Sequence, residues 1–257
     1  MTNPRTSSLN AERALDILLA LGDVGPDGLS LSEIVKQIGG GKSAAHRSIA
    51  ALLNKGFAEP TGRYGYYRLG PTIAMLAQRQ ERLEPQIQKL RPGMTEFARR
   101  TGFTTFLMVQ AGLDAACAEM VSRSSRRHFT LGVGGRVPMG VAAGSLALLS
   151  ILPEKTAVQI IEANAERYMR YPSQRDVDKV VVAAQVGEAR RRGYAVNMAY
   201  YLPEEGGLGL PILRSNASEV NVAVSFNAPL EMMNEQWIEE IIEELRECLN
   251  TATSSRV

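Results

Sequence analysis

The sequence predicts an α+β protein with two domains, the first small and mainly helical, the second an antiparallel sheet with flanking helices. Three observations support this class. Amphipathic helical patterns dominate residues 11–54, apolar residues near heptad spacing follow in 71–91, and helices then mix with strands such as the alternating E-V-N-V-A-V-S-F of 219–226. The expected parts are residues 1–70, 71–91 and 92–257.

Composition is that of an ordinary globular protein, with 45% hydrophobic and 22% charged residues in a chain of 257. The N-terminal M-T-N-P-R-T-S-S lacks the apolar stretch of a secretory signal, and the run Val141–Leu152 is too short to cross a bilayer. Cys117 and Cys248 form no C-x-x-C spacing, which argues against a disulfide framework or a zinc site. We therefore expect a cytoplasmic protein with no membrane partner, no metal and no cofactor.

Charge is distributed unevenly along the chain. Residues 1–92 contain 12 Lys and Arg against 8 Asp and Glu, whereas Glu231–Glu247 is strongly acidic. A basic first domain is compatible with a polyanionic partner, although a surplus of this size also occurs on ordinary surfaces. Charge alone therefore assigns no function.

The first helix is predicted over residues 11–21. Leu15, Leu18 and Leu19 recur at helical spacing and are expected to face a core. A connection rich in Gly, Asp and Pro at 22–28 separates this helix from the next one.

The stretch I-G-G-G-K-S at 38–43 ends like a phosphate-binding P-loop, but its context differs. Ser30 and Glu33 form an S-x-x-E capping box, which starts an amphipathic helix over 31–38. A P-loop needs a buried strand before the loop and a glycine where this chain has Lys36, inside that helix. The glycines are therefore predicted to form a turn between two helices.

A further helix is predicted over residues 42–54. Apolar residues mark its inner face, while the small residues Ala44, Ser48 and Ala50 leave room for a close approach on the outside. Ser43 and Arg47 suit base edges in the major groove, and the other cations suit phosphates. The candidate DNA-contacting residues of this helix are Lys42, Ser43, His46 and Arg47.

Residues 57–70 read as a β-hairpin whose turns contain Thr61-Gly62 and Gly65. Arg63 and Tyr64 fall at its tip, and Arg68 on its return strand. A basic, aromatic hairpin after such a helix pair is a wing that can touch the backbone or minor groove of double-stranded DNA. The first domain is therefore predicted to be a winged helix-turn-helix.

The segment 71–91 is predicted to be a linker helix that begins at Pro71. Its apolar residues approach heptad spacing, so it can pair with a second copy, although Pro85 predicts a kink. The alternative is a helix that packs on its own domain. The apolar positions are Leu76, Leu83, Ile87 and Leu90.

These segments resemble the IclR family of bacterial transcription regulators over residues 8–249. The shared motifs include R-A-L-D-I-L-L-A-L, L-S-L-S-E-I and Y-R-L-G, then G-x-R-V-P-x-G-x-x-A-G-S-L-A-L-L, R-R-G-Y-A-V-N, G-L-G-L-P-I and V-A-V-S. The resemblance implies a recognition helix containing Lys42, Ser43 and Arg47, a basic wing tip at Arg63, and dimerisation through the linker. It also implies a GAF-like effector-binding domain.

The resemblance further places a small effector between a helix start and the sheet of the second domain. A helix N-terminus suits a carboxylate, because its N–H groups and dipole favour negative charge. The alternatives are a plain helix serine at 145 and a hydroxyl at 225 bonded to backbone. The implied polar contacts are Gly144, Ser145, Asn197 and Ser225, with Asn227 nearby.

The chain departs from the usual family pattern at three places. Gly140, Gly144-Ser145 and Tyr200-Tyr201 stand where many members carry His, Gly-Lys and an acidic pair. A pocket with fewer charges and more aromatic edges favours an aromatic or other apolar carboxylate over glyoxylate-like acids.

The main alternative function is that of an enzyme, or of a ligand-binding module with no DNA role. The chain has only two histidines and no G-x-S-x-G elbow, so no catalytic residues are expected. We predict a DNA-binding regulator that recognises a palindromic operator as a homodimer, with a dimer of dimers as the alternative. Repression is the expected sign, because promoter occlusion requires only tight binding, and activation remains open.

Overall fold

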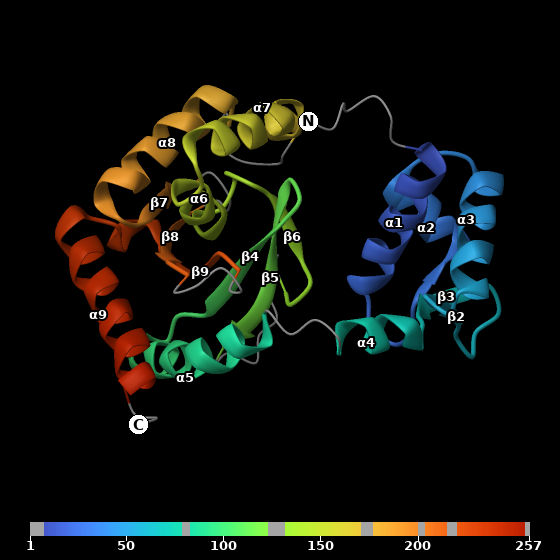
Figure 1. Ribbon diagram of the computed structural model, residues 1–257, viewed down its shortest axis with the longest axis horizontal. Coiled ribbons are helices and arrows are strands. Elements are labelled where there is room, and N and C mark those ends of the chain that lie inside the picture. The colour runs from blue at the N-terminus through green and yellow to red at the C-terminus, as the bar shows by residue number, and fades with distance from the viewer. Residues whose placement is uncertain are drawn as a thin grey trace. The chain divides into compact units, whose positions relative to one another are not determined.

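The computed structural model describes residues 8–78, 83–122, 132–170, 177–199, 204–214 and 220–254. The chain divides into two compact units, Met1–Glu81 and Arg82–Val257, which we call unit 1 and unit 2 and describe separately (Figure 1).

Unit 1 packs helices against a small antiparallel sheet with the strand order β1-β3-β2. The order of helix, helix, glycine turn, helix and hairpin confirms the predicted winged helix-turn-helix. Its elements are α1 (Leu9–Gly22), β1 (Leu29–Ser30), α2 (Leu31–Ile38), α3 (Lys42–Asn54), β2 (Ala58–Pro60), β3 (Tyr66–Leu69) and α4 (Pro71–Ala77).

The start of α2 confirms the predicted capping box. The Glu33 backbone N donates to Ser30 Oγ at 3.3 Å, and the Ser30 backbone N donates to Glu33 Oε2 at 2.8 Å. The glycine turn follows, with φ of 74° at Gly39 and 88° at Gly40. Residues other than glycine rarely adopt such positive φ angles, so glycine is needed in this turn for α3 to start at Lys42.

The core face predicted for α1 is confirmed at Leu18, which packs against the core of unit 1, and is wrong at Leu15 and Leu19. The buried residues are Ile17, Ala20 and Leu21, whereas Leu15 is 61% exposed and Leu19 is 43% exposed. The helix carries two overlapping apolar stripes, so helical periodicity alone could not choose between them. The choice follows from packing in the core of unit 1, which includes residues of α2, α3 and β2.

The predicted linker helix over 71–91 is also wrong as a single kinked helix. Helix α4 ends at Ala77, and α5 (Glu84–Thr101) begins after its N-cap Leu83. Pro85 therefore lies in the first turn of α5, where a missing N–H costs little. Ile87 and Leu90 are 8% and 4% exposed within the core of unit 2, as expected from the alternative of a helix that packs on its own domain.

Unit 2 contains a six-stranded antiparallel sheet with the order β6-β5-β4-β9-β8-β7. The predicted antiparallel α+β class is confirmed. The Ser215-Asn216 pair, which predicts a turn before the last strand, lies outside the described residues. Its strands are β4 (Thr105–Ala111), β5 (Asp114–Val121), β6 (Arg136–Pro138), β7 (Ala195–Met198), β8 (Glu205–Ile212) and β9 (Val222–Pro229). Its other elements are α6 (Ala143–Ser150), α7 (Glu154–Arg170), α8 (Lys179–Arg192), the short 3-10 helix η1 (Leu230–Met232) and α9 (Glu235–Ser254).

The sheet is covered on both faces. Alternation along β4 directs Phe106 and Met108 into the core that α6, α7 and α8 share, and Leu107 into the core beneath α5 and α9. In Figure 1, α7 and α8 lie along the top of unit 2 and α5 along its bottom, with strands of the sheet between them. Strand alternation in β4 thus separates two apolar layers, and the start of α6 lies in the first of them.

Candidate functional sites

The outer face of α3 carries the predicted DNA-contacting residues. Lys42, Ser43, His46 and Arg47 are all exposed, whereas Ala45, Ile49 and Leu52 on the opposite face are buried. In the part of the chain that the structure describes, no carboxylate lies within ion-pair distance of Lys42 or Arg47. Ser48, expected on the outer face, is buried instead at 6% exposure.

A cation that sequence reasoning missed lies beside the start of α3. A Cβ placed on Gly40 would lie 3.7 Å from Nε and Nη2 of Arg13, on α1. Arg13 Nη1 also donates to Asn10 Oδ1 at 3.2 Å. Local pattern gives no signal for this residue, because the contact joins α1 to a turn far along the chain.

The hairpin of β2 and β3 forms the predicted wing. Arg63 and Tyr64 are exposed at its turn. The Arg63 Cζ lies 3.9 Å from the centroid of the Tyr66 ring, within the range of a cation–π contact. Sequence reasoning missed Tyr66, whose only signal was an aromatic residue close to the arginine.

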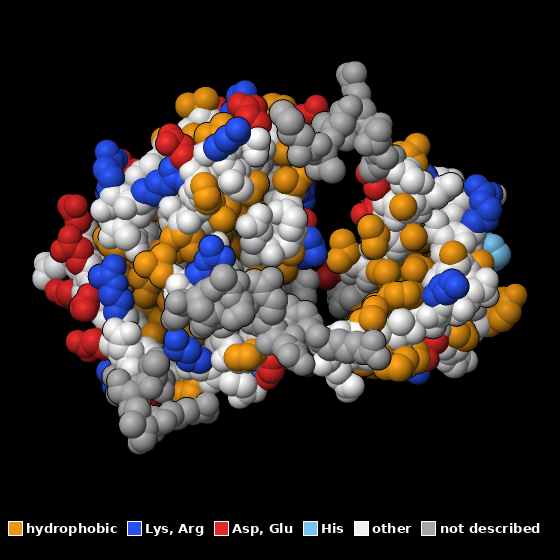
Figure 2. All heavy atoms as spheres, viewed as in Figure 1, with side chains coloured by type: hydrophobic (Ala, Val, Ile, Leu, Met, Phe, Trp, Pro, Cys, Tyr) orange, Lys and Arg blue, Asp and Glu red, His pale blue; other side chains and the backbone are white. Residues whose placement is uncertain are grey.

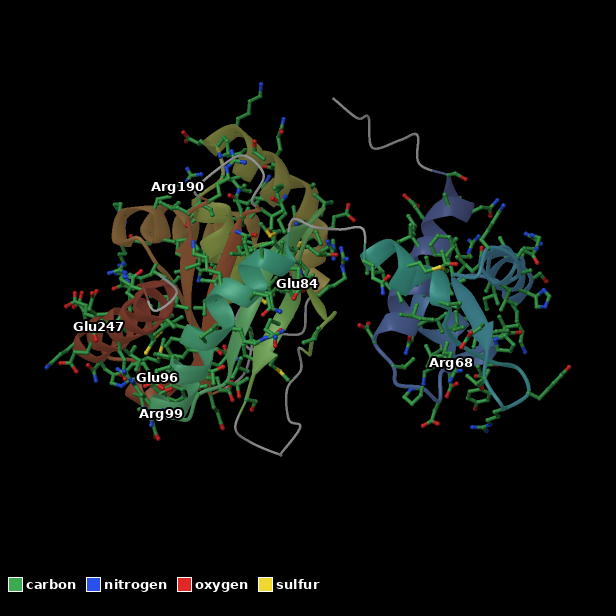
Figure 3. The ribbon with its side chains drawn as sticks, turned by 60° about the horizontal axis from the view of Figure 1, so that its bottom comes forward. Arg68, Glu84, Glu96, Arg99, Arg190 and Glu247 are labelled. Atoms are coloured by element: carbon green, nitrogen blue, oxygen red, sulfur yellow. The ribbon has the colours of Figure 1, made fainter. Side chains whose placement is uncertain are left out.

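Arg68 differs from the other predicted cations of the wing. It lies opposite Glu59 in the β2–β3 register, and its Nε is 2.8 Å from Glu59 Oε1 (Figure 3). Both side chains are partly exposed, so the pair adds little stability. It does place a negative charge beside Arg68, which leaves Arg68 less available to a phosphate than Lys42 or Arg63.

The predicted effector residues of unit 2 gather around the start of α6. A Cβ placed on Gly144 would lie 2.7 Å from Ser225 Oγ, and one placed on Gly207 would lie 3.2 Å from Asn227 Oδ1 and 3.7 Å from the Asn197 Cβ. Residues from α6, β7, β8 and β9 therefore meet at one point on the sheet. The glycines of β8 allow this contact, because they present no side chain toward α6.

Ser145 does not present its hydroxyl to this cluster. Its Oγ accepts from the backbone N of Gly140 and of Ala142, each at 3.0 Å, and donates to the Ala142 carbonyl oxygen at 2.8 Å. The side chain is fully buried. The donor and acceptor sites of this hydroxyl serve the turn before α6, so contact between Ser145 and an effector stays a prediction that rests on its backbone N–H at the helix start.

The asparagines of the cluster are also engaged. Asn197 is 2% exposed and donates from Nδ2 to the Val141 carbonyl oxygen at 2.7 Å. Burial raises the pKa of the Glu205 carboxyl, and a hydrogen bond with Asn227 opposes that shift. Tyr200-Tyr201, predicted to give the pocket aromatic edges, lie outside the described residues.

A groove of about 270 Å³ lies elsewhere in unit 2, between α8 and the outermost strand β7. None of the five predicted effector residues lines it. The lining residues are Gln185, Glu188, Ala189, Arg192, Tyr194, Val196 and Met198.

Reactive and metal-binding groups are sparse in the described ranges. Burial raises the pKa of the Cys117 thiol to about 12 and also raises the pKa of the Cys248 thiol, so neither is an activated nucleophile. Within the described ranges, no three His, Cys, Asp or Glu residues come together as metal ligands. No described helix combines the length and apolarity needed to cross a membrane.

Two protein-family models match the chain. "IclR helix-turn-helix domain" matches residues 10–62, and "Bacterial transcriptional regulator IclR C-terminal" matches residues 85–253. The two matches together cover the helix-turn-helix of unit 1 and nearly the whole of unit 2.

Individual relatives agree with these matches. The chain is 33% identical over 141 residues to the HTH-type transcriptional regulator Rv1719 of Mycobacterium tuberculosis, an alignment covering 55% of this chain and 53% of that relative. It is 21% identical over 218 residues to the transcriptional repressor IclR of Escherichia coli, covering 82% and 77%. The first alignment thus spans about half the length of the mycobacterial protein.

Solved structures share the fold. The crystal structure of an IclR homolog complexed with 4-hydroxybenzoate, from Microbacterium hydrocarbonoxydans, matches with a TM-score of 0.70 and 23% identity, covering 96% of this chain and 99% of that one. The chain belongs to the IclR family of bacterial transcriptional regulators.

Proposed function

We propose that this protein is a cytoplasmic repressor without enzymatic activity that binds a palindromic operator and responds to a small carboxylate. The observation that carries the proposal is the outer face of α3, where Lys42 and Arg47 are exposed and lack an acidic partner among the described residues. Cations left unpaired on a helix that follows a tight turn suit the phosphates and base edges of a major groove.

Each predicted contact has a distinct role in this proposal. Arg47 and Ser43 read base edges, and Lys42 and His46 contact phosphates. Arg63 and Tyr64 at the wing contact the backbone or the minor groove. Arg68 contributes less, because Glu59 holds its guanidinium.

The proposed dimer uses an apolar surface of unit 1 in place of the heptad seam. Leu15 and Leu19 of α1 are exposed, as are Met75 and Leu76 of α4, at 57% and 51%. Figure 2 shows hydrophobic side chains gathered over α1 and α4. An exposed apolar surface of this kind favours association with a second copy, which would bring two α3 helices to two half-sites. A dimer of dimers extends the same arrangement.

The proposed effector site is the cluster at the start of α6, with Gly144, Asn197, Ser225 and Asn227 as contacts. The Ser145 hydroxyl holds the turn there, and the N–H groups of Gly144 and Ser145 at the helix start are the proposed contacts of the carboxylate. None of these side chains is charged, which favours an aromatic or other apolar carboxylate, and the fold relative complexed with 4-hydroxybenzoate supports that class. Binding must favour one arrangement of the dimer over another to change operator affinity.

Selection of fragments from the source genome tests the DNA role. Full-length protein should enrich fragments that share a palindrome with half-sites one helical turn or a multiple apart. The Arg47→Ala protein should enrich the same palindrome less strongly, because one of its base-edge contacts is lost. Equal recovery of all fragments by the wild type at physiological salt would refute operator recognition.

Calorimetric titration tests the effector class. We expect 4-hydroxybenzoate and benzoate to bind more tightly than glyoxylate and pyruvate. Binding by Ser225→Ala should be weaker, because a buried hydroxyl that faces the site is lost. Small acids that bind as tightly as the aromatic acids would contradict the proposed class.

A further inference from the structure

The tip of the wing contains an aromatic platform under its arginine. We infer that Tyr66 is a positioning residue, which acts through Arg63 to hold a guanidinium ready for the DNA backbone. The inference rests on the proposed DNA-binding function and extends it to a residue that itself need not touch DNA.

The contact geometry preserves the hydrogen-bonding capacity of Arg63. Its Cζ lies over the Tyr66 ring, 3.9 Å from the centroid, a separation that suits stacking of the flat guanidinium face on the ring. The N–H donors of a guanidinium lie in its plane and point away from such a ring. The ring therefore restricts the side chain without occupying the donors that a phosphate would use.

Tyr66 is itself firmly held. Its backbone N donates to the Arg63 carbonyl oxygen at 3.2 Å, and its carbonyl oxygen accepts from the Thr61 backbone N at 2.9 Å. On its other side Tyr66 pairs with Ser30 of β1, the residue that caps α2. The platform is thus fixed to the helix-turn-helix, and the orientation of Arg63 follows from it.

An acidic neighbour explains why positioning matters. Hydrogen bonds from Ser30 lower the pKa of the Glu33 carboxyl, and the charge of Arg63 lowers it further. Arg63 therefore interacts electrostatically with the Glu33 carboxylate, yet the two side chains form no ion pair in the described structure. Without the ring, the long arginine side chain would be free to turn toward Glu33 and away from DNA.

Fluorescence anisotropy with a labelled duplex of arbitrary sequence tests the inference in the full-length protein. Tyr66→Leu should weaken binding about two- to fivefold per wing, the size of an exposed cation–π contact. Tyr66→Phe keeps the ring and should bind like the wild type. In an Arg63→Ala background, Tyr66→Leu should cause no further loss, because the two residues act as one unit.

Several outcomes would overturn the inference. These are wild-type affinity in Tyr66→Leu while Arg63→Ala binds weakly, equal losses in Tyr66→Phe and Tyr66→Leu, or independent losses in the double variant. Failure of the wild type to bind any duplex would instead refute the proposed function. If Tyr66→Leu does not fold, proton NMR of the wild type tests the contact. The side-chain methylene protons of Arg63 should show upfield shifts caused by the Tyr66 ring. Absence of these shifts would contradict the stacking.

Discussion

Gly209 of β8 and Ala143 of α6 touch so closely that a Cβ on Gly209 would lie 2.4 Å from the Ala143 carbonyl oxygen. The carbonyl belongs to the backbone and the position of a Cβ is set by the backbone, so a rotamer change cannot relieve the clash. The same carbonyl lies at the start of α6, where the proposed effector contacts converge. The glycine therefore sets how near this helix comes to the sheet.

Gly209→Ala is expected to lower the free energy of unfolding by about 1–3 kcal/mol, because strand and helix must move apart. Urea denaturation measures the change. Gly187 provides the control, since it lies inside α8 with nothing within 4 Å of an added Cβ. Gly187→Ala should stabilise the protein by up to about 1 kcal/mol. Equal effects from the two substitutions would contradict the proposed contact.

Thr105→Val is expected to raise the free energy of unfolding by about 1 kcal/mol. The Thr105 side chain is fully buried, and its Oγ1 has no hydrogen-bond partner in the described structure. Replacing an unsatisfied hydroxyl by a methyl group removes a desolvation cost. Thr104→Val is the matched control, because Thr104 Oγ1 donates to Ser122 Oγ at 2.9 Å. That variant should lose about 0.5–1.5 kcal/mol, and a gain in it would undermine the argument.

Glu96 makes stability depend on pH. Hydrogen bonds from Arg99 and Arg100 lower the pKa of its carboxyl from 4.5 to about 2 (Figure 3). A lowered folded-state pKa means that its contribution is complete above pH 4.5 and is lost as the pH falls toward about 2. The difference in unfolding free energy between wild type and Glu96→Gln should therefore shrink across that window. High salt should reduce the difference at neutral pH, and a difference that stays constant with pH would contradict the assignment.

Substitutions at Arg47 and Arg63 are expected to change DNA binding in different ways. Arg47→Ala should reduce discrimination between the operator and a base-substituted operator by about 1–3 kcal/mol, because base-edge hydrogen bonds carry sequence information. Arg63→Ala should weaken binding to all sequences alike and reduce the salt slope by about 1 per wing. Titrations over a range of salt concentrations separate the two. Unchanged affinity and slope in both variants would show that α3 and the wing do not contact DNA.

Local features of unit 1 were predictable because their causes lie within a few residues. Ser30 and Glu33 cap α2 through their own side chains, and Gly39 and Gly40 adopt angles that their missing side chains allow. In unit 2, Gly193 ends α8 in the left-handed conformation for the same reason. Short-range periodicity also indicated the inner face of α3.

Helical periodicity left open which apolar residues are buried, and the tertiary structure decided it. The two apolar stripes of α1 are equivalent until the core of unit 1 buries Ile17 and exposes Leu15. Leu90, at heptad-like spacing, belongs to the core of unit 2, since burial depends on which surface is available and spacing does not specify it.

The candidate sites show the same division. The sequence by itself determined that cations would line the exposed face of α3, because helical spacing opposes them to the buried residues. Only the tertiary structure assigned the Ser145 hydroxyl to the turn at Gly140 and placed Arg63 on the Tyr66 ring. Those contacts depend on backbone direction and side-chain rotamer, which the folded chain sets and residue type alone does not.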